Sequence, residues 1–250
     1  MKIFRTLLVG SLFAGFTSAN DLKPLMAVPG DLVFEQDFEA GQLSKEQWTA
    51  RQKTRWEVAN DVLTGIPSTP ETQAARPHHK GLEPRGSAGL TPMNFVAKLS
   101  IRYFGDESTA ATPFIEFGHH NCRVQFSAEE GAFLLVESES KKVAWSENFT
   151  FQSGEWYHIL AEMVDDEFVF QIEGGPTFHT RNAAFSKAKE HAVGVAGFRK
   201  GKIEIDNFSI WNAKQGAQQN GWEQKKAAIP AFEPVIMENR VAQLKKKKAA

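Results

Sequence analysis

Short runs of alternating apolar and polar residues, separated by turn-forming residues, make up most of this sequence. Alternation with a period of two is typical of strands that bury one face, and helical periodicity is scarce between the two ends of the chain. About a dozen such runs, at the spacing of short strands and tight turns, predict an all-β jelly-roll sandwich of two antiparallel sheets. We expect strands at residues 32–38, 56–66, 80–85, 94–104, 114–118, 122–127, 132–138, 143–146, 156–163, 168–173, 176–180, 193–198 and 203–211.

The two ends of the chain differ from this pattern. A basic start and an apolar run at 6–16 precede Thr17-Ser18-Ala19, the kind of small residues that a signal peptidase recognises. Residues 1–19 are therefore expected to be a signal peptide that exports the protein to the periplasm or the cell exterior. The alternative is a buried N-terminal strand or helix.

The rest of the chain divides into a sandwich at 20–213 and a tail at 214–250. The tail is rich in Gln and Lys and ends in a lysine run, so we expect it to be poorly structured, partly strapped to the sandwich and partly disordered. No segment reaches the roughly 20 apolar residues that a membrane span needs, so no span is expected.

Charge and cysteine content exclude other classes of protein. The sequence has 29 Lys and Arg against 30 Asp and Glu, a net charge of −1 that argues against a general nucleic-acid binder. Its single cysteine, Cys122, rules out an internal disulfide and is expected to be a small buried apolar residue. The 20 Phe and 6 Trp supply the apolar surface for a core without disulfides. The sequence specifies no oligomeric state.

Alternation also indicates which polar side chains face away from the core. Ile115 and Phe117 are expected in the core, which places Glu116 on the opposite side of the same strand. The same argument turns Arg123 and Gln125 outward. We expect one polar face made of His79, Glu83, Arg85, Arg102, Glu116, Arg123 and Gln125, with His119 and His120 in a turn at its rim. The alternative is a solvated face with ordinary ion pairs between strands.

Arginine and carboxylate groups suit bidentate bonds to sugar hydroxyls or to uronates, so the expected partner is a carbohydrate. Glu83 and Glu116 are the candidates for acid–base catalysis, with His79 or His120 assisting. The candidates for ligand binding are Arg85, Arg102, His119, Arg123 and Gln125. Neighbouring histidines on a strand point to opposite faces and no known ligand spacing is present, so no metal or other cofactor is expected. The alternative is a zinc or calcium-like ion held by one histidine of each His-His pair together with Glu83 or Glu116.

Several segments resemble known families. The segments Asp37-Phe38-Glu39, Trp56-Glu57-Val58 and 61–65 resemble the opening of 3-keto-disaccharide hydrolase-type domains. The segments 154–159 and 205–211 are similar to laminin G-like and concanavalin A-like sandwiches. The resemblance covers residues 31–212 and implies a concanavalin A-like jelly roll and a hydrolase activity.

Glu204-Ile205-Asp206 resembles part of the Glu-x-Asp-x-x-Glu strand of family 16 glucanases, but the third acid is absent. We expect this run to be a structural strand at the end of the domain.

Three hypotheses follow for the function. The first is an exported hydrolase of a glycoside or a modified disaccharide. The second is a glycan-binding protein without catalysis, with Trp145 or another exposed aromatic residue as the sugar platform. The third is a structural or partner-binding domain that makes contact through its tail. The sequence leaves open whether the protein is an enzyme.

Overall fold

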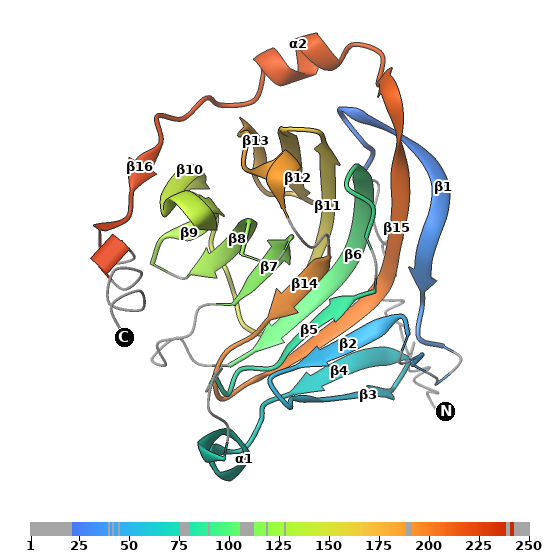
Figure 1. Cartoon of the computed structure of the whole chain (residues 1–250), viewed down its shortest axis with the longest axis vertical. Coiled ribbons are helices and arrows are strands. Elements are labelled where there is room, and N and C mark those ends of the chain that lie inside the picture. Colours follow the sequence, from blue (N-terminus) through green and yellow to red (C-terminus); the bar gives the residue numbers. More distant parts are fainter. Residues whose placement is uncertain are drawn as a thin grey trace, which may run out of the picture.

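The computed structural model describes residues 22–39, 41, 43–44, 46–75, 81–89, 91–105, 113–118, 120–127, 129–188, 192–238 and 241–242. Within them the chain forms two antiparallel sheets packed face to face, and the predicted all-β jelly-roll sandwich of the concanavalin A-like kind is confirmed (Figure 1). The predicted signal peptide lies outside the described residues. In the described part of the chain, no helix is long and apolar enough to cross a membrane.

Each sheet has eight strands in the described part of the chain. Sheet A runs in the order β13 (Thr177–Arg181), β12 (Glu167–Ile172), β11 (Trp156–Val164), β6 (Phe95–Phe104), β15 (Lys202–Gln218), β4 (Val62–Ile66) and β3 (Arg55–Ala59), with β1 (Ala27–Gln36) also pairing with β15. Sheet B runs in the order β16 (Val235–Ile236), β10 (Lys141–Ser146), β9 (Gly131–Val136), β8 (Cys122–Ser127), β7 (Phe114–Phe117), β14 (Val193–Ala196), β5 (Arg85–Ala88) and β2 (Trp48–Arg51). The described helical elements are α1 (Pro70–Ala74), α2 (Trp222–Ala227) and the single 3-10 turns η1 (Glu137–Glu139) and η2 (Phe185–Lys187).

The core lies between the two sheets and follows the predicted alternation. In β8, Cys122, Val124 and Phe126 are buried in it, and in β7 Ile115 and Phe117 are buried in it. Each strand therefore turns its remaining side chains to the outer face of its sheet. The expected burial of Cys122 is confirmed.

Several strands differ from their expected bounds: the run at 56–66 forms the two strands β3 and β4, and β1 begins at Ala27. Strands β2 and β16 were not expected. The strand expected at 80–85 is β5, which begins at Arg85. Pro84 precedes it and has no N–H to donate, so the ladder starts after the proline. Strand β15 continues to Gln218, so residues 214–218 belong to sheet A.

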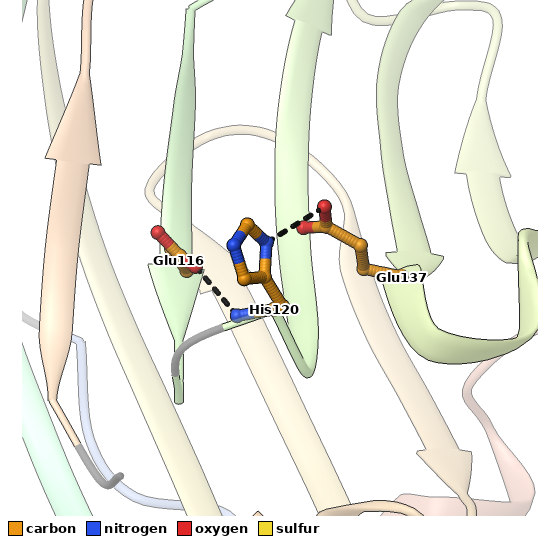
Figure 2. A group of neighbouring side chains, drawn as sticks. All are labelled: Glu116, His120 and Glu137. Atoms are coloured by element: carbon orange, nitrogen blue, oxygen red, sulfur yellow. Dashed lines mark hydrogen bonds and ion pairs between the residues drawn. The ribbon is translucent and has the colours of Figure 1, made fainter. Parts of the chain in front are cut away.

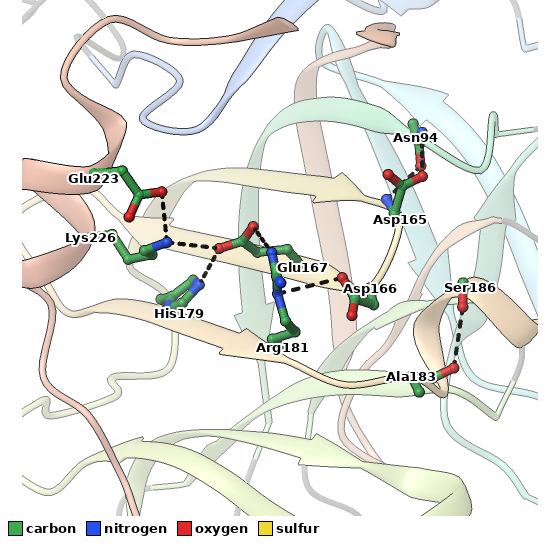
Figure 3. Close-up of polar contacts among 10 residues, drawn as sticks. All are labelled: Asn94, Asp165, Asp166, Glu167, His179, Arg181, Ala183, Ser186, Glu223 and Lys226. Carbon is green, nitrogen blue, oxygen red and sulfur yellow. Dashed lines mark hydrogen bonds and ion pairs between the residues drawn. The ribbon is translucent and has the colours of Figure 1, made fainter. Parts of the chain in front are cut away.

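The segment after β15 lies along the edges of both sheets. Helix α2 packs over sheet A, with Trp222 buried against Met26 and Val169. Lys226 of this helix lies 3.8 Å from Glu167, which also pairs with His179 and Arg181 (Figure 3). The chain then passes to β16, which pairs with β10 of sheet B (Figure 1).

Candidate functional site

The outer face of sheet B gathers most of the side chains that the sequence selects. Residues directly opposite one another on neighbouring strands form two rows across this face. One row contains Arg51, Arg85, Ala196, Phe114, Gln125, Phe133 and Trp145. The other contains Thr49, Ser87, Gly194, Glu116, Arg123, Leu135 and Lys142.

Glu116 lies near the middle of the face and is 5% exposed. Its Oε2 accepts a hydrogen bond from Nη2 of Arg85 at 2.5 Å. Arg85 is on β5 and Glu116 is on β7, so the arginine side chain has to cross the intervening strand β14. The residues of β14 on this face, Gly194 and Ala196, are small, which leaves the path of the guanidinium open.

His120 lies in the turn that connects β7 to β8, as expected. Its backbone N–H donates to Oε1 of Glu116 at 2.8 Å, and its φ of 56° is in the left-handed region. Histidine is among the few residues that adopt this region with some frequency, and such conformations cluster at functional sites. The side chain is 52% exposed, so it remains open to a ligand.

Glu137 is a site residue that the sequence reasoning missed. Its Oε1 lies 3.1 Å from Nδ1 of His120, and Figure 2 shows the imidazole between the carboxylates of Glu116 and Glu137. Its Oε2 lies 3.6 Å from Nη1 of Arg123. The sequence pattern could have predicted it. Phe133 and Leu135 face outward in β9, and continuing the same alternation places residue 137 on the same face.

One aromatic ring orders the two arginines of this cluster. The guanidinium of Arg85 lies 5.3 Å from the ring centroid of Phe114, and that of Arg123 lies 4.6 Å from it. Contacts of this kind add a favourable cation–π interaction to each ion pair. Each guanidinium is thus held between the Phe114 ring and one carboxylate.

Glu116, His120 and Glu137 are also the described residues that could ligate a metal ion, because one donor atom from each lies within 4.8 Å of the others. The two carboxylates already pair with Arg85 and Arg123, so their charge is balanced. A divalent cation would have to compete with both guanidinium groups. The donor set therefore does not favour a metal, and the expectation of none stays a prediction.

Of the other residues that the sequence predicts for this face, one lies on it, one lies before β5 and two are outside the described residues. Gln125 is on this face, as expected. Glu83 precedes β5 in a bend, and among the described residues no contact joins it to Glu116, so its role stays a prediction. His79 and His119 lie outside the described residues.

The expectation that Arg102 shares this face is wrong. Strand β6 pairs with β11 and β15 in sheet A, so Arg102 lies on the outer face of that sheet, on the other side of the sandwich. There its Nε donates to Glu204 at 2.9 Å, and its guanidinium lies 4.5 Å from the Trp156 ring. Alternation separates core from surface but does not say to which sheet a strand belongs.

Glu204 and Asp206 are on β15, which lies in the interior of sheet A and not at its margin as expected. Burial opposes the ionisation of Glu204, but hydrogen bonds from Lys202 and Arg102 outweigh it and lower the pKa of this carboxyl group. This acid is therefore held in an ion-pair network on the sheet opposite the His120 cluster.

No protein-family model matches the sequence, and no curated protein matches it. Solved structures share the fold. A GlcNAcα1-4Gal-releasing endo-β-galactosidase from Clostridium perfringens superposes with a TM-score of 0.50 at 11% identity, over 78% of this chain and 66% of that chain, just under two thirds of its length. A protein of unknown function with a galectin-like fold from Bacillus subtilis superposes with a TM-score of 0.53 at 9% identity, over 75% of this chain and 99% of that chain. At these identities the likeness shows the fold alone.

Proposed function

We propose that this protein is exported and hydrolyses a glycoside or a modified disaccharide on the outer face of sheet B. The observation that carries the proposal is the placement of the His120 imidazole between Glu116 and Glu137. The signal-peptide pattern supports export, and the resemblance to 3-keto-disaccharide hydrolase-type domains supports hydrolysis. The galactosidase that superposes on the chain acts on a carbohydrate by its name, which agrees with the same class of ligand.

The geometry supplies the groups that glycoside hydrolysis needs. Retaining glycosidases hold two carboxyl groups about 5–5.5 Å apart. Oxygen atoms of Glu116 and Glu137 lie within 4.8 Å of each other, so this pair replaces Glu83 and Glu116 as the carboxylates of the proposal. Imidazole is a common general acid and base because it exchanges a proton near neutral pH, and a carboxylate on Nδ1 fixes its orientation.

In the proposed reaction, protonated His120 donates its proton to the glycosidic oxygen as the bond from that oxygen to the sugar breaks. The carboxylates of Glu116 and Glu137 stabilise the positive charge that develops on the sugar ring. Water then adds to the ring, and the neutral imidazole accepts the proton that the water releases.

A glycan-binding protein without catalysis is the second candidate, since arginines and an aromatic ring suffice for binding. Trp145 fits the expected platform poorly, because Phe232 packs against it with ring centroids 4.7 Å apart. Phe114 lies in the same row beside Gln125, but it is buried and the guanidinium groups of Arg85 and Arg123 lie over its ring, so it fits a sugar platform no better.

The test is a glycan array beside a hydrolysis screen, with wild type, His120→Asn and His158→Asn. Asparagine removes the imidazole but tolerates the left-handed backbone at position 120. His158 is the matched control, because it bonds Ser100 at 2.8 Å on the outer face of sheet A. We expect turnover to fall about 10²–10⁴-fold in His120→Asn and to stay near wild type in His158→Asn.

Glycan binding by the wild type without turnover on any substrate would replace the hydrolase with the glycan-binding protein. Absence of both binding and turnover on every glycan would overturn both candidate functions. Equal losses of turnover in the two variants would remove His120 from the mechanism.

A further inference from the structure

We propose that Gln52, Gln73 and Glu83 bind a Ca²⁺ ion at the edge of the sandwich, beside the pair of strands β2 and β5. The site is separate from the His120 cluster, so it goes beyond the proposed function and does not depend on it. It also departs from the expectation of no metal. Two observations carry it, a cradle of oxygen atoms at Gly81 and a set of buried acceptors that have no donor in the described part of the chain.

The oxygen cradle surrounds Gly81, which precedes β5. A Cβ atom added to this glycine would lie within 2.7 Å of Oε1 of Gln52 and of both carboxylate oxygens of Glu83. Cβ atoms do not approach other atoms so closely, so the three oxygens can face one space only because residue 81 has no side chain. The backbone of Gly81 is not in the left-handed region, so its conformation does not require glycine. The glycine instead makes room for the oxygens.

The acceptors of this cradle lack donors. Oε1 of Gln52 is buried and accepts no hydrogen bond from a described residue, and the Glu83 carboxylate makes no hydrogen bond or ion pair with one. Buried acceptors are rarely left in this state, and an ion or an ordered water molecule is the usual explanation. Because a carboxylate and an amide oxygen face the same space, a cation between them would satisfy both groups.

Gln73 of helix α1 brings another buried oxygen to this edge. It is 2% exposed, and its Nε2 donates to the backbone oxygen of Gln52. This bond fixes which end of the amide is the acceptor, and it leaves Oε1 buried without a donor among the described residues. Ser68 precedes the helix, and its N–H donates to the carbonyl oxygen of Leu82 at 3.0 Å, but its buried Oγ likewise has no partner in the described ranges. Three segments far apart in the sequence thus bring oxygens together.

The chemistry of the donor set indicates the ion. Ca²⁺ takes about six to eight oxygen ligands in flexible geometry, whereas Mg²⁺ demands a near-ideal octahedron and Zn²⁺ prefers nitrogen and sulfur. The His120 cluster offers two carboxylates that already pair with arginines, but the Glu83 carboxylate has no such pair among the described residues. Because the set contains a single carboxylate, we expect a dissociation constant of about 10⁻⁴–10⁻³ M, the range of extracellular calcium sites.

The experiment titrates the full chain, treated first with a chelator, with calcium chloride and with magnesium chloride. Binding is measured by calorimetry and by the midpoint of urea unfolding. At a Ca²⁺ concentration about ten times the dissociation constant, the ratio of folded to unfolded protein should rise about tenfold, because the ion binds the folded state. Mg²⁺ should bind about tenfold more weakly, because it gives up its own water ligands reluctantly.

Variants locate the ion. Glu83→Gln removes the charged ligand and should weaken Ca²⁺ binding about tenfold or more. Gln52→Asn withdraws the amide oxygen and should also weaken binding, while asparagine tolerates the left-handed backbone at this position, where φ is 56°. Gly81→Ala places a methyl group among the three oxygens and should abolish binding. Glu57→Gln is the matched control, because it makes the same charge change at an exposed position on β3 and should leave the affinity within about twofold.

Four other results would overturn the inference. The first is a chain whose heat signal and unfolding midpoint do not respond to about 10 mM Ca²⁺, well above the expected dissociation constant. The second is binding that survives in Glu83→Gln but is lost in Glu137→Gln, which would place the ion in the His120 cluster. Equal losses in Glu83→Gln and Glu57→Gln would show unspecific attraction to acidic groups, and equal affinities for Mg²⁺ and Ca²⁺ would overturn the choice of ion.

Discussion

Substitutions in the ion pair between Arg85 and Glu116 can test whether the site is lost while the protein stays folded. Both side chains are nearly buried, with 13% of Arg85 and 7% of Glu116 exposed, and the two charged atoms are 2.5 Å apart. Removal of one partner from a buried pair costs about 3–5 kcal/mol, because the other charge stays buried. Arg85→Met should lower the free energy of unfolding by about 3 kcal/mol, the low end of this range. The reason is that Glu116 still accepts a hydrogen bond from the backbone N–H of His120.

The double variant should recover most of this loss. Glu116→Gln retains a carbonyl oxygen for the His120 N–H, and Arg85→Met then leaves no buried charge in the pair. We therefore expect the double variant to be within about 1 kcal/mol of wild type, with a coupling energy of about 2 kcal/mol or more. Glycan binding should be lost in the same folded variant, because Arg85 and Glu116 both belong to the proposed site.

The assay is urea unfolding monitored by tryptophan fluorescence. The change in stability is taken from the shift of the midpoint, provided that the dependence of the free energy of unfolding on urea concentration is unchanged. Lys141→Met is the control, because Lys141 and Glu139 form an ion pair of the same kind with 40% and 34% exposure. Its effect should stay below about 1 kcal/mol. If the stability loss of the double variant equals the sum of the two single losses to within about 0.5 kcal/mol, the two side chains are not coupled and the reasoning is refuted.

Two further predictions concern a thiol and the response to acid. Burial, followed by the nearby charges of Glu116 and Glu137, raises the pKa of the Cys122 thiol. We expect no reaction with a thiol reagent in the native protein and full reaction in urea, and rapid native labelling would contradict the assigned burial. Burial opposes the ionisation of Glu167, but bonds from Arg181 and His179 outweigh it and lower its pKa. This carboxylate therefore stabilises the fold above its ordinary pKa of 4.5 and loses that effect as pH falls through its folded value. Wild type should lose more stability than Glu167→Gln between pH 6 and pH 3, and equal losses in urea titrations would disprove this.

The orientation of the site residues could be predicted from the sequence. Glu116 lies between Ile115 and Phe117, and Arg123 and Gln125 alternate with apolar residues of β8. Burial of the apolar set leaves one direction for the polar set, because successive side chains of a strand point to opposite faces. These three residues therefore lie on the outer face of sheet B as expected.

Other parts of the site needed the tertiary structure. Glu137 is 17 positions from His120 in the sequence, and the hairpin of β8 and β9 brings the two together. The contact from Arg85 to Glu116 crosses β14, a strand that comes much later in the chain. No local pattern predicts which distant strand lies between two others.

The failure at Arg102 shows the same limit. Its outward direction was predicted, yet β6 belongs to sheet A and Arg102 faces Glu204 instead of Glu116. The sequence by itself determined the sandwich and the inward or outward direction of each side chain, because both depend on a period of two along the chain. Only the tertiary structure decided which outward side chains share a face and meet as the His120 cluster, because strand order depends on pairing between distant segments.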